Sequence, residues 1–206
     1  MQEDYVKQIE STISLVDKLV DKYISEPRKS QVESFLNDKG HLYFEAPASS
    51  KERYHSSYPG GLAKHSINVY KNLRKLNTAF ECGFSEESML IASLFHDLGK
   101  AMSSDLKTPH YLDNVDDWQK KRGINYNYNE NEMYMTNHLR SIYILSQAKI
   151  DLSAEEFMAI YLNDGQYVQE NRPYAMKECA LALYLHMADR LACEQESKPK
   201  LEDLEE

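Results

Sequence analysis

The sequence predicts an all-α fold, a bundle of about six or seven helices that forms one domain over residues 1–206. Apolar residues recur at spacings of three and four along most of the chain, as on the buried face of a helix. No stretch alternates apolar and polar residues over a useful length, which argues against a sheet. A chain of 206 residues with 42% hydrophobic composition can bury a core without disulfides or an obligate metal.

The N-terminal part of the chain begins with an amphipathic helix, which the apolar spacing predicts over residues 4–25 and which Pro27 ends. A short helix is expected at residues 31–37. The apolar run at residues 42–46 leads into Pro47, and a residue before proline avoids the helical region. We therefore expect extended chain there.

Two more helices are predicted in the middle of the chain. A Tyr-Pro-Gly-Gly turn at residues 58–61 precedes a helix that runs to about Phe80. Ser85 then opens a capping sequence for the next helix, which carries the apolar run at residues 89–98. Gly99 is expected to end this helix.

The C-terminal part of the chain is expected to add three helices, at residues 132–149, 153–162 and 174–196. The second of these begins with Ser-Ala-Glu-Glu, a capping sequence. The acidic tail at residues 197–206 is expected to be a solvated end.

The segment at residues 101–131 is too long for an ordinary connection, whose median is about 4–6 residues. It is rich in Tyr and contains Trp118, residue types that disordered segments lack, so we expect a lid over a site. Trp118, Arg122 and Tyr126 combine aromatic and basic character, which suits stacking a base and holding phosphates. The alternative interpretation is a surface loop with scattered charges.

Charge and hydropathy exclude several classes of protein. The formal net charge of −9 argues against bulk electrostatic binding to nucleic acid or to an anionic membrane. The first residues are acidic where a signal peptide would be basic, and no apolar run approaches the length of a membrane span. The sequence therefore predicts a cytoplasmic protein.

The cysteines and most of the histidines have ordinary structural interpretations. Cys82, Cys179 and Cys193 form no CxxC pair, which suits a reducing compartment and excludes a thiolate zinc knuckle. They are interpreted as small buried hydrophobic residues. His55 lies near the turn before the third helix and could reach a pocket mouth, and His186 shares a helical face with a candidate ligand.

Four ionisable residues lie on helix faces that the apolar pattern assigns to the core. They are His65, His96, Asp97 and Asp189. A buried carboxylate without a partner is prohibitively costly, so these groups must be protonated, paired with one another or bound to a cation. Two imidazoles and two carboxylates form a nitrogen and oxygen site that suits a divalent ion such as Mn, Fe, Co, Ni, Zn or Mg.

The same residues resemble the H…HD…D pattern of HD-domain metal-dependent phosphohydrolases. His65 follows a Pro-Gly-Gly-Leu turn, His96-Asp97 stands in Leu-Phe-His-Asp-Leu-Gly-Lys, and Asp189 stands in Met-Ala-Asp-Arg. The resemblance covers residues 45–195, which would form the core on which the N-terminal helix packs. The sequence is similar in particular to the HD domains of 3′–5′ exoribonucleases and to bacteriophage-type proteins of this size.

This resemblance implies a helical fold and hydrolysis of a phosphoester, commonly of a nucleotide, by a metal-activated water. Asp97 would be both a ligand and an acceptor for the proton of the water. Lys100 would contact a phosphate, although it could also only complement the helix dipole. His138 stands where two-metal members of the family often have another histidine, and Arg140 beside it could clamp phosphate.

A second metal site is in doubt on the same resemblance. Many two-metal members place a further histidine where this chain has Asn163 and Asp164. We therefore expect one tightly bound metal, with any second ion weak and held partly by substrate, and we assign Asp164 to substrate binding.

Three functions compete at this point. The first is a metal-dependent phosphohydrolase for a nucleotide or related small phosphorylated substrate, which the acidic charge favours over long nucleic acid. The nearest alternative is a 3′–5′ exoribonuclease or a cyclic-nucleotide phosphodiesterase. The third is a non-catalytic HD module that binds metal and nucleotide. The sequence is compatible with a homo-oligomer in each case.

Overall fold

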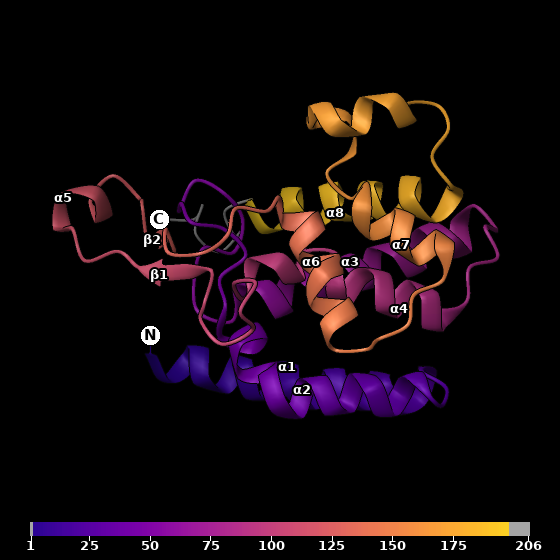
Figure 1. Cartoon of the computed structure of the whole chain (residues 1–206), viewed down its shortest axis with the longest axis horizontal. Coiled ribbons are helices and arrows are strands. Elements are labelled where there is room, and N and C mark those ends of the chain that lie inside the picture. The colour runs from indigo at the N-terminus through magenta and orange to yellow at the C-terminus, as the bar shows by residue number, and fades with distance from the viewer. Residues whose placement is uncertain (1, 198–206) are drawn as a thin grey trace, which may run out of the picture.

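The computed structural model describes residues 2–197, and its helices form a bundle that confirms the predicted all-α class (Figure 1). The predicted acidic tail at 197–206 lies outside the described residues, apart from Ser197. Within these residues, no helix combines the length and apolar character needed to span a bilayer. The helices of eight or more residues are α1 (Gln2–Tyr23), α2 (Arg28–Glu45), α3 (Gly61–Ala79), α4 (Glu86–Phe95), α6 (Asn137–Gln147), α7 (Ala154–Tyr161) and α8 (Ala180–Ser197).

The core lies where α3 packs along α4 and α8. Leu62 and Leu73 of α3, Leu94 of α4 and Leu185 of α8 are fully buried. Each leucine buried in this way stabilises the fold by about 1.5–3 kcal/mol. Truncation of Leu73 to alanine would cost about 2–5 kcal/mol, because a cavity is added to the lost transfer energy.

Helices α1 and α2 form a separate layer along one side of this core, the lower side in Figure 1. Residues 42–46 were expected to be extended, and this is wrong for all but the last of them, because α2 continues to Glu45. Tyr43 is fully buried and donates its hydroxyl proton to the carbonyl of Leu94 at 2.9 Å, which fixes α2 against α4. The effect of Pro47 reaches only Ala46, whose ψ of 143° is extended.

The segment at residues 101–131 forms a small antiparallel hairpin of β1 (Tyr111–Asp113) and β2 (Tyr126–Tyr128), with α5 (Asp117–Lys120) between the strands. Tyr111 pairs with Tyr128 in this register. The hairpin projects from the bundle, and α5 lies at its outer end (Figure 1). The expectation of no strands is therefore wrong here, because strands of three residues are too short to give an alternating pattern.

The predicted helix starts at Ser85 and Ser153 are confirmed. The Ser85 side chain accepts from the backbone N–H of Ser88 and caps α4. Ser153 and Glu156 form a reciprocal capping box at the start of α7.

Other predicted helix ends are wrong by several residues. Helix α4 ends at Phe95, and a 3₁₀ turn, η1 (Leu98–Lys100), follows it. Helix α6 begins at Asn137 rather than at residue 132, because Thr136 is still extended. Helix α8 begins at Ala180, after two short 3₁₀ helices, η2 (Gly165–Tyr167) and η3 (Gln169–Tyr174).

Candidate metal centre

Three helices bring together two histidines and one aspartate at the centre of the fold. His65 comes from α3, His96 from the C-terminal end of α4 and Asp189 from α8. One possible ligand atom from each lies within 4.8 Å of the others. His65 Nε2 is 2.9 Å from Asp189 Oδ1, and His96 Nε2 is 3.8 Å from the same oxygen. Both imidazoles are fully buried.

The start of α3 is fixed by the glycine turn that precedes it. Gly60 has a φ of 82°, a left-handed conformation that glycine adopts without steric cost. A Cβ on Gly61 would lie 2.1 Å from the carbonyl oxygen of Ser56, so the preceding loop must pass against a residue without a side chain. His65, one turn further on, is thereby held on the core-facing side of α3.

His96 presents a free nitrogen to the centre of this group. Its Nδ1 donates to the carbonyl of Ser93 at 2.8 Å, so in the neutral imidazole the lone pair is on Nε2. Nε2 is buried and has no hydrogen-bond partner among the described residues. Buried polar atoms are normally satisfied, and a cation beside Asp189 would satisfy this one. These residues therefore fit a divalent metal ion.

Asp97 lies at the edge of the same group. Its Oδ2 is 3.5 Å from His96 Nε2 and is ion-paired with Lys100, which follows on η1. Asn163, at the end of α7, contacts its other oxygen at 3.4 Å. Burial raises the pKa of Asp97, but the positive charge of Lys100 more than offsets burial, so the net shift is downward and the carboxylate is ionised.

His65 is held between two carboxylates in the metal-free protein. Burial lowers its pKa, but the hydrogen bonds to Asp189 and Glu196 outweigh burial and raise it to about 9. Burial likewise raises the pKa of Asp189, and its hydrogen bond with His65 brings it well below the usual range. Without metal, His65 is thus an imidazolium that neutralises part of the negative charge.

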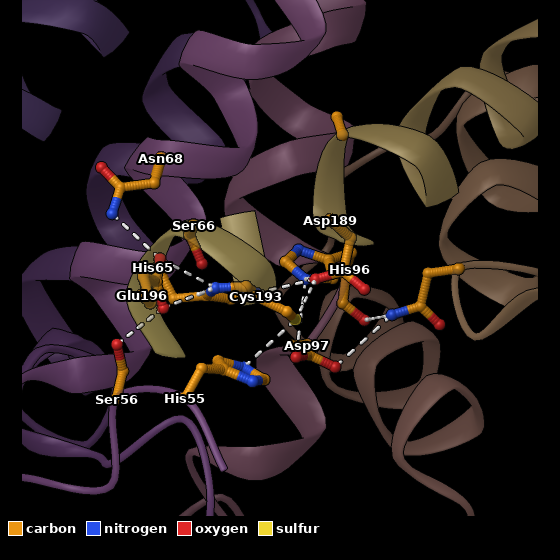
Figure 2. A network of polar contacts seen from close by, with 12 residues as sticks. His55, Ser56, His65, Ser66, Asn68, His96, Asp97, Asp189, Cys193 and Glu196 are labelled. Atoms are coloured by element: carbon orange, nitrogen blue, oxygen red, sulfur yellow. Dashed lines mark hydrogen bonds and ion pairs between the residues drawn. The ribbon is translucent and has the colours of Figure 1, made fainter. Parts of the chain in front are cut away.

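Glu196 is a site residue that the sequence analysis missed (Figure 2). Its carboxylate accepts from His65 Nδ1 at 3.2 Å, from Ser56 Oγ at 2.6 Å and from Asn68 Nδ2 at 2.9 Å. A carboxylate that accepts a hydrogen bond from the second nitrogen of a metal-ligating histidine fixes the tautomer and the orientation of the ring. The sequence pattern that could have identified Glu196 is its spacing, because it follows Asp189 by seven residues and so lies on the same face of α8.

Cys193 and His55 also lie at the centre. Cys193 Sγ is 3.5 Å from Asp189 Oδ1 and 3.8 Å from His55 Nε2. Together with His65 they form a second group whose ligand atoms lie within 4.8 Å of one another. Cys193 was interpreted as a small buried hydrophobic residue, and the structure places its partly buried sulfur beside candidate ligands, as its position four residues after Asp189 could have indicated. Burial raises the pKa of the Cys193 thiol, so it is protonated without metal.

A cavity of about 410 Å³ opens onto these residues. The hairpin supplies one wall through Tyr111 and Tyr128, so part of the segment at 101–131 does face the site. Lys100 and Arg190 are cationic side chains of the cavity lining. The lining also includes Tyr54, His55, Asp97, Asp164, Tyr167, His186, Asp189 and Cys193.

The other candidates in the hairpin segment lie elsewhere. Trp118 is 63% exposed on α5, and the Arg122 guanidinium stacks on its ring at 4.5 Å. Neither residue lines the cavity. Tyr126 lines a neighbouring apolar cavity of about 620 Å³ between α1 and the hairpin. The structure thus does not bring these three residues together with the candidate ligands.

Arg140 is buried and bonded within the fold. Its guanidinium donates to the carbonyls of Gly99 and Met135, each at 2.8 Å, and is 3.2 Å from Glu132. It does not line the cavity. Its contacts tie α6 to η1 and so hold the turn that carries Lys100.

His138 is buried on α6 beside the end of α7. Its Nε2 is 3.0 Å from Thr136 Oγ1, and its ring packs edge-on against Tyr161 at 5.0 Å. Its Nδ1 is buried without a hydrogen-bond partner among the described residues and lies 3.7 Å from Asp164 Oδ2. Asp164 is the member of this pair that reaches the cavity.

Comparison with known proteins adds a family match. The family model of the HD domain matches residues 62–193. An uncharacterized protein of Clostridium beijerinckii (strain ATCC 51743 / NCIMB 8052) is 28% identical over 100 residues. The aligned region is 48% of this chain and 61% of that protein, so the chain spans less than two thirds of this relative's length. No solved structure matches the chain.

Proposed function

Because the chain belongs to the HD-domain family, we propose that it is a metal-dependent phosphohydrolase acting on a nucleotide or a related small phosphorylated substrate. The family match confirms the resemblance drawn from His65, His96-Asp97 and Asp189, all of which lie within residues 62–193. Members of this family are in general metal-dependent hydrolases. The substrate class is our own inference.

The observation that carries the proposal is that His96 Nε2 has no hydrogen-bond partner in the described part of the chain. It is buried, it faces Asp189 and His65, and it lies beside a cavity open to solvent. A divalent ion would be held by His65, His96, Asp97 and Asp189. Such an ion lowers the pKa of a bound water and polarises a phosphoryl oxygen.

The cavity's own residues would bind and orient the substrate. Burial lowers the pKa of Lys100, but the charge of Asp97 more than offsets this and raises it, so the ammonium stays charged for contact with a phosphate. Arg190 lies over the ring of Tyr167 at 5.8 Å and supplies a second cation. Tyr111 and Tyr128 offer faces on which a base can stack.

The size and charge of the site favour a small substrate. A volume of about 410 Å³ is typical of pockets for single small molecules. The chain has a net charge of −9, which opposes the capture of long nucleic acid by bulk electrostatics.

The test is phosphate release by the purified full chain from mononucleotides, cyclic nucleotides and short RNA, with each divalent ion in turn. We expect turnover of mononucleotides with a transition metal, and loss of both turnover and bound metal in Asp97→Ala. The control variant Lys75→Ala, at an exposed position on α3, should match the wild type. Preference for RNA, with rates that fall steeply as salt rises, would favour the exoribonuclease instead. Bound metal without turnover of any substrate would favour the non-catalytic module.

A further inference from the structure

We propose that Cys193 and His55 extend the metal centre, so that a thiolate and a third imidazole bind the ion that His65, His96 and Asp189 hold. The centre would then take zinc or another thiophilic divalent ion in preference to magnesium. This inference rests on the metal centre of the proposed function, and it adds two ligands outside the four residues of the family pattern.

The geometry places both side chains around the same space. In Figure 2 the sulfur of Cys193 lies between His55 and Asp189, and the His65 side chain lies next to Cys193. The sulfur is 3.8 Å from His55 Nε2 and 3.5 Å from Asp189 Oδ1. The rings of His55 and His65 are 4.4 Å apart between centroids.

The two groups of ligand atoms describe one centre. His65 belongs to both the group with His96 and Asp189 and the group with His55 and Cys193. Its Nδ1 is held by Glu196 at 3.2 Å, so only Nε2 can bind a cation. A single Nε2 lone pair serves one ion, and the two groups must therefore share it.

A second observation points to a ligand at this place besides the cysteine. His96 Nε2 is completely buried, has no hydrogen-bond partner within residues 2–197 and lies 3.8 Å from Oδ1 of Asp189, the residue that Cys193 contacts. The other two cysteines differ, because their sulfurs face the backbone carbonyls of Leu76 and Glu155, and neither belongs to a group of possible ligand atoms among the described residues. Cys193 is also the cysteine that lines the cavity.

The donor set decides the class of metal. Magnesium prefers an octahedron of oxygens, whereas thiolate and imidazole suit zinc, cobalt and iron. On coordination the S–H bond of Cys193 is replaced by an S–metal bond, and the proton leaves to bulk water with no change of oxidation state. The ion would thus have three nitrogens, one sulfur and carboxylate oxygen within reach.

Cobalt(II) substitution of the full-length protein tests the proposal directly. A cobalt–thiolate bond gives a charge-transfer absorption in the near ultraviolet, whereas any bound cobalt gives weaker d–d bands in the visible. We expect both in the wild type and in the control Cys82→Ser. Cys193→Ser should keep the d–d bands and lose the charge-transfer band. A wild type with d–d bands alone, or a Cys193→Ser variant that keeps the charge-transfer band, would overturn the inference and leave the proposed function standing. No d–d bands in any sample would overturn both.

A measurement on the unaltered protein guards against a variant that fails to fold. Alkylation of each cysteine is followed by mass spectrometry with and without one equivalent of zinc. We expect zinc to slow the alkylation of Cys193 by at least about tenfold and to leave Cys82 unchanged. Equal rates for Cys193 with and without zinc, in protein shown to contain the metal, would contradict the proposal.

Discussion

Glu196 offers the sharpest test of how the fold orients the metal centre. We predict that Glu196→Ala weakens both the fold and its affinity for a divalent ion. The side chain is only 10% exposed, and its two oxygens receive hydrogen bonds from His65, Ser56 and Asn68. Truncation would leave these donors facing a cavity.

The magnitude follows from the burial of the donors. His65 and Ser56 are buried, and a buried donor left without a partner costs about 1–3 kcal/mol. Asn68 is only partly buried and can reach water, and the Ser56 hydroxyl can rotate toward another acceptor. We therefore expect a loss of about 2–4 kcal/mol in the free energy of unfolding. For a chain of this size, that corresponds to a fall in Tm of roughly 4–16 °C.

The assay compares thermal unfolding in chelator with zinc titration of the same samples. Loss of an outer partner of a metal-ligating histidine typically costs about 10–100-fold in metal affinity. Glu196→Gln keeps an acceptor for His65 and should recover more than half of both losses. The exposed Glu170→Ala serves as the control. If Glu196→Ala matched this control in Tm and in zinc affinity, Glu196 would not orient His65.

Further predictions concern the turn after α4 and the protonation of the site. Lys100→Ala should lower kcat at least about tenfold and leave bound metal unchanged, since it removes the proposed phosphate contact and none of the proposed metal ligands. Elemental analysis and steady-state kinetics would measure the two effects. Gly99→Ala should lower Tm by several degrees, because its Cβ would lie 2.2 Å from the carbonyl oxygen of Asn137, and an unchanged melting curve would contradict this packing. In metal-free protein the raised pKa of His65 contributes stability that is complete below pH 6.5 and is lost as pH rises through about 9. The two carboxylates that bind it have lowered pKa values, so their contribution is lost as pH falls below their ordinary values of 3.8 and 4.5. Thermal melts in chelator should therefore show greatest stability between about pH 4.5 and 6.5, and a maximum near pH 9 would refute the assignment.

The helices were predictable where local signals and the tertiary structure agree. Ser85 and Ser153 cap α4 and α7 as their sequences indicated, because the capping interaction is made within one turn. Extended chain was wrongly predicted at residues 42–46, because the conformational restriction on a residue before proline applies to Ala46 alone. The three-residue strands of the hairpin have no local pattern that could reveal them.

The convergence of His65, His96 and Asp189 could be predicted because each lies on the apolar face of its own helix. Cys193 and Glu196 share the α8 face with Asp189, and extending the same spacing argument would have found them. Spacing alone does not identify them as site residues, because a cysteine on that face also suits a small buried hydrophobic residue and a glutamate near a helix end suits a surface position.

Residues on loops were beyond the reach of helical spacing. His55 and Ser56 reach the centre because the chain turns sharply at Gly60 and Gly61, which is a tertiary arrangement. Arg140 was assigned to phosphate from its place beside His138. One carbonyl that it binds, that of Gly99, belongs to a turn distant in sequence, and only the fold brings the two together.

His65, His96 and Asp189 are proposed above to hold a divalent metal ion, and this can be measured directly. The most direct measurement is elemental analysis of the full-length protein after dialysis against zinc, cobalt or manganese, beside His96→Gln. The account predicts stoichiometric metal in the wild type and its loss in the variant, with the helical circular dichroism of both unchanged. A wild-type protein that retains no metal under any condition, or a His96→Gln variant that retains it fully, would contradict the account.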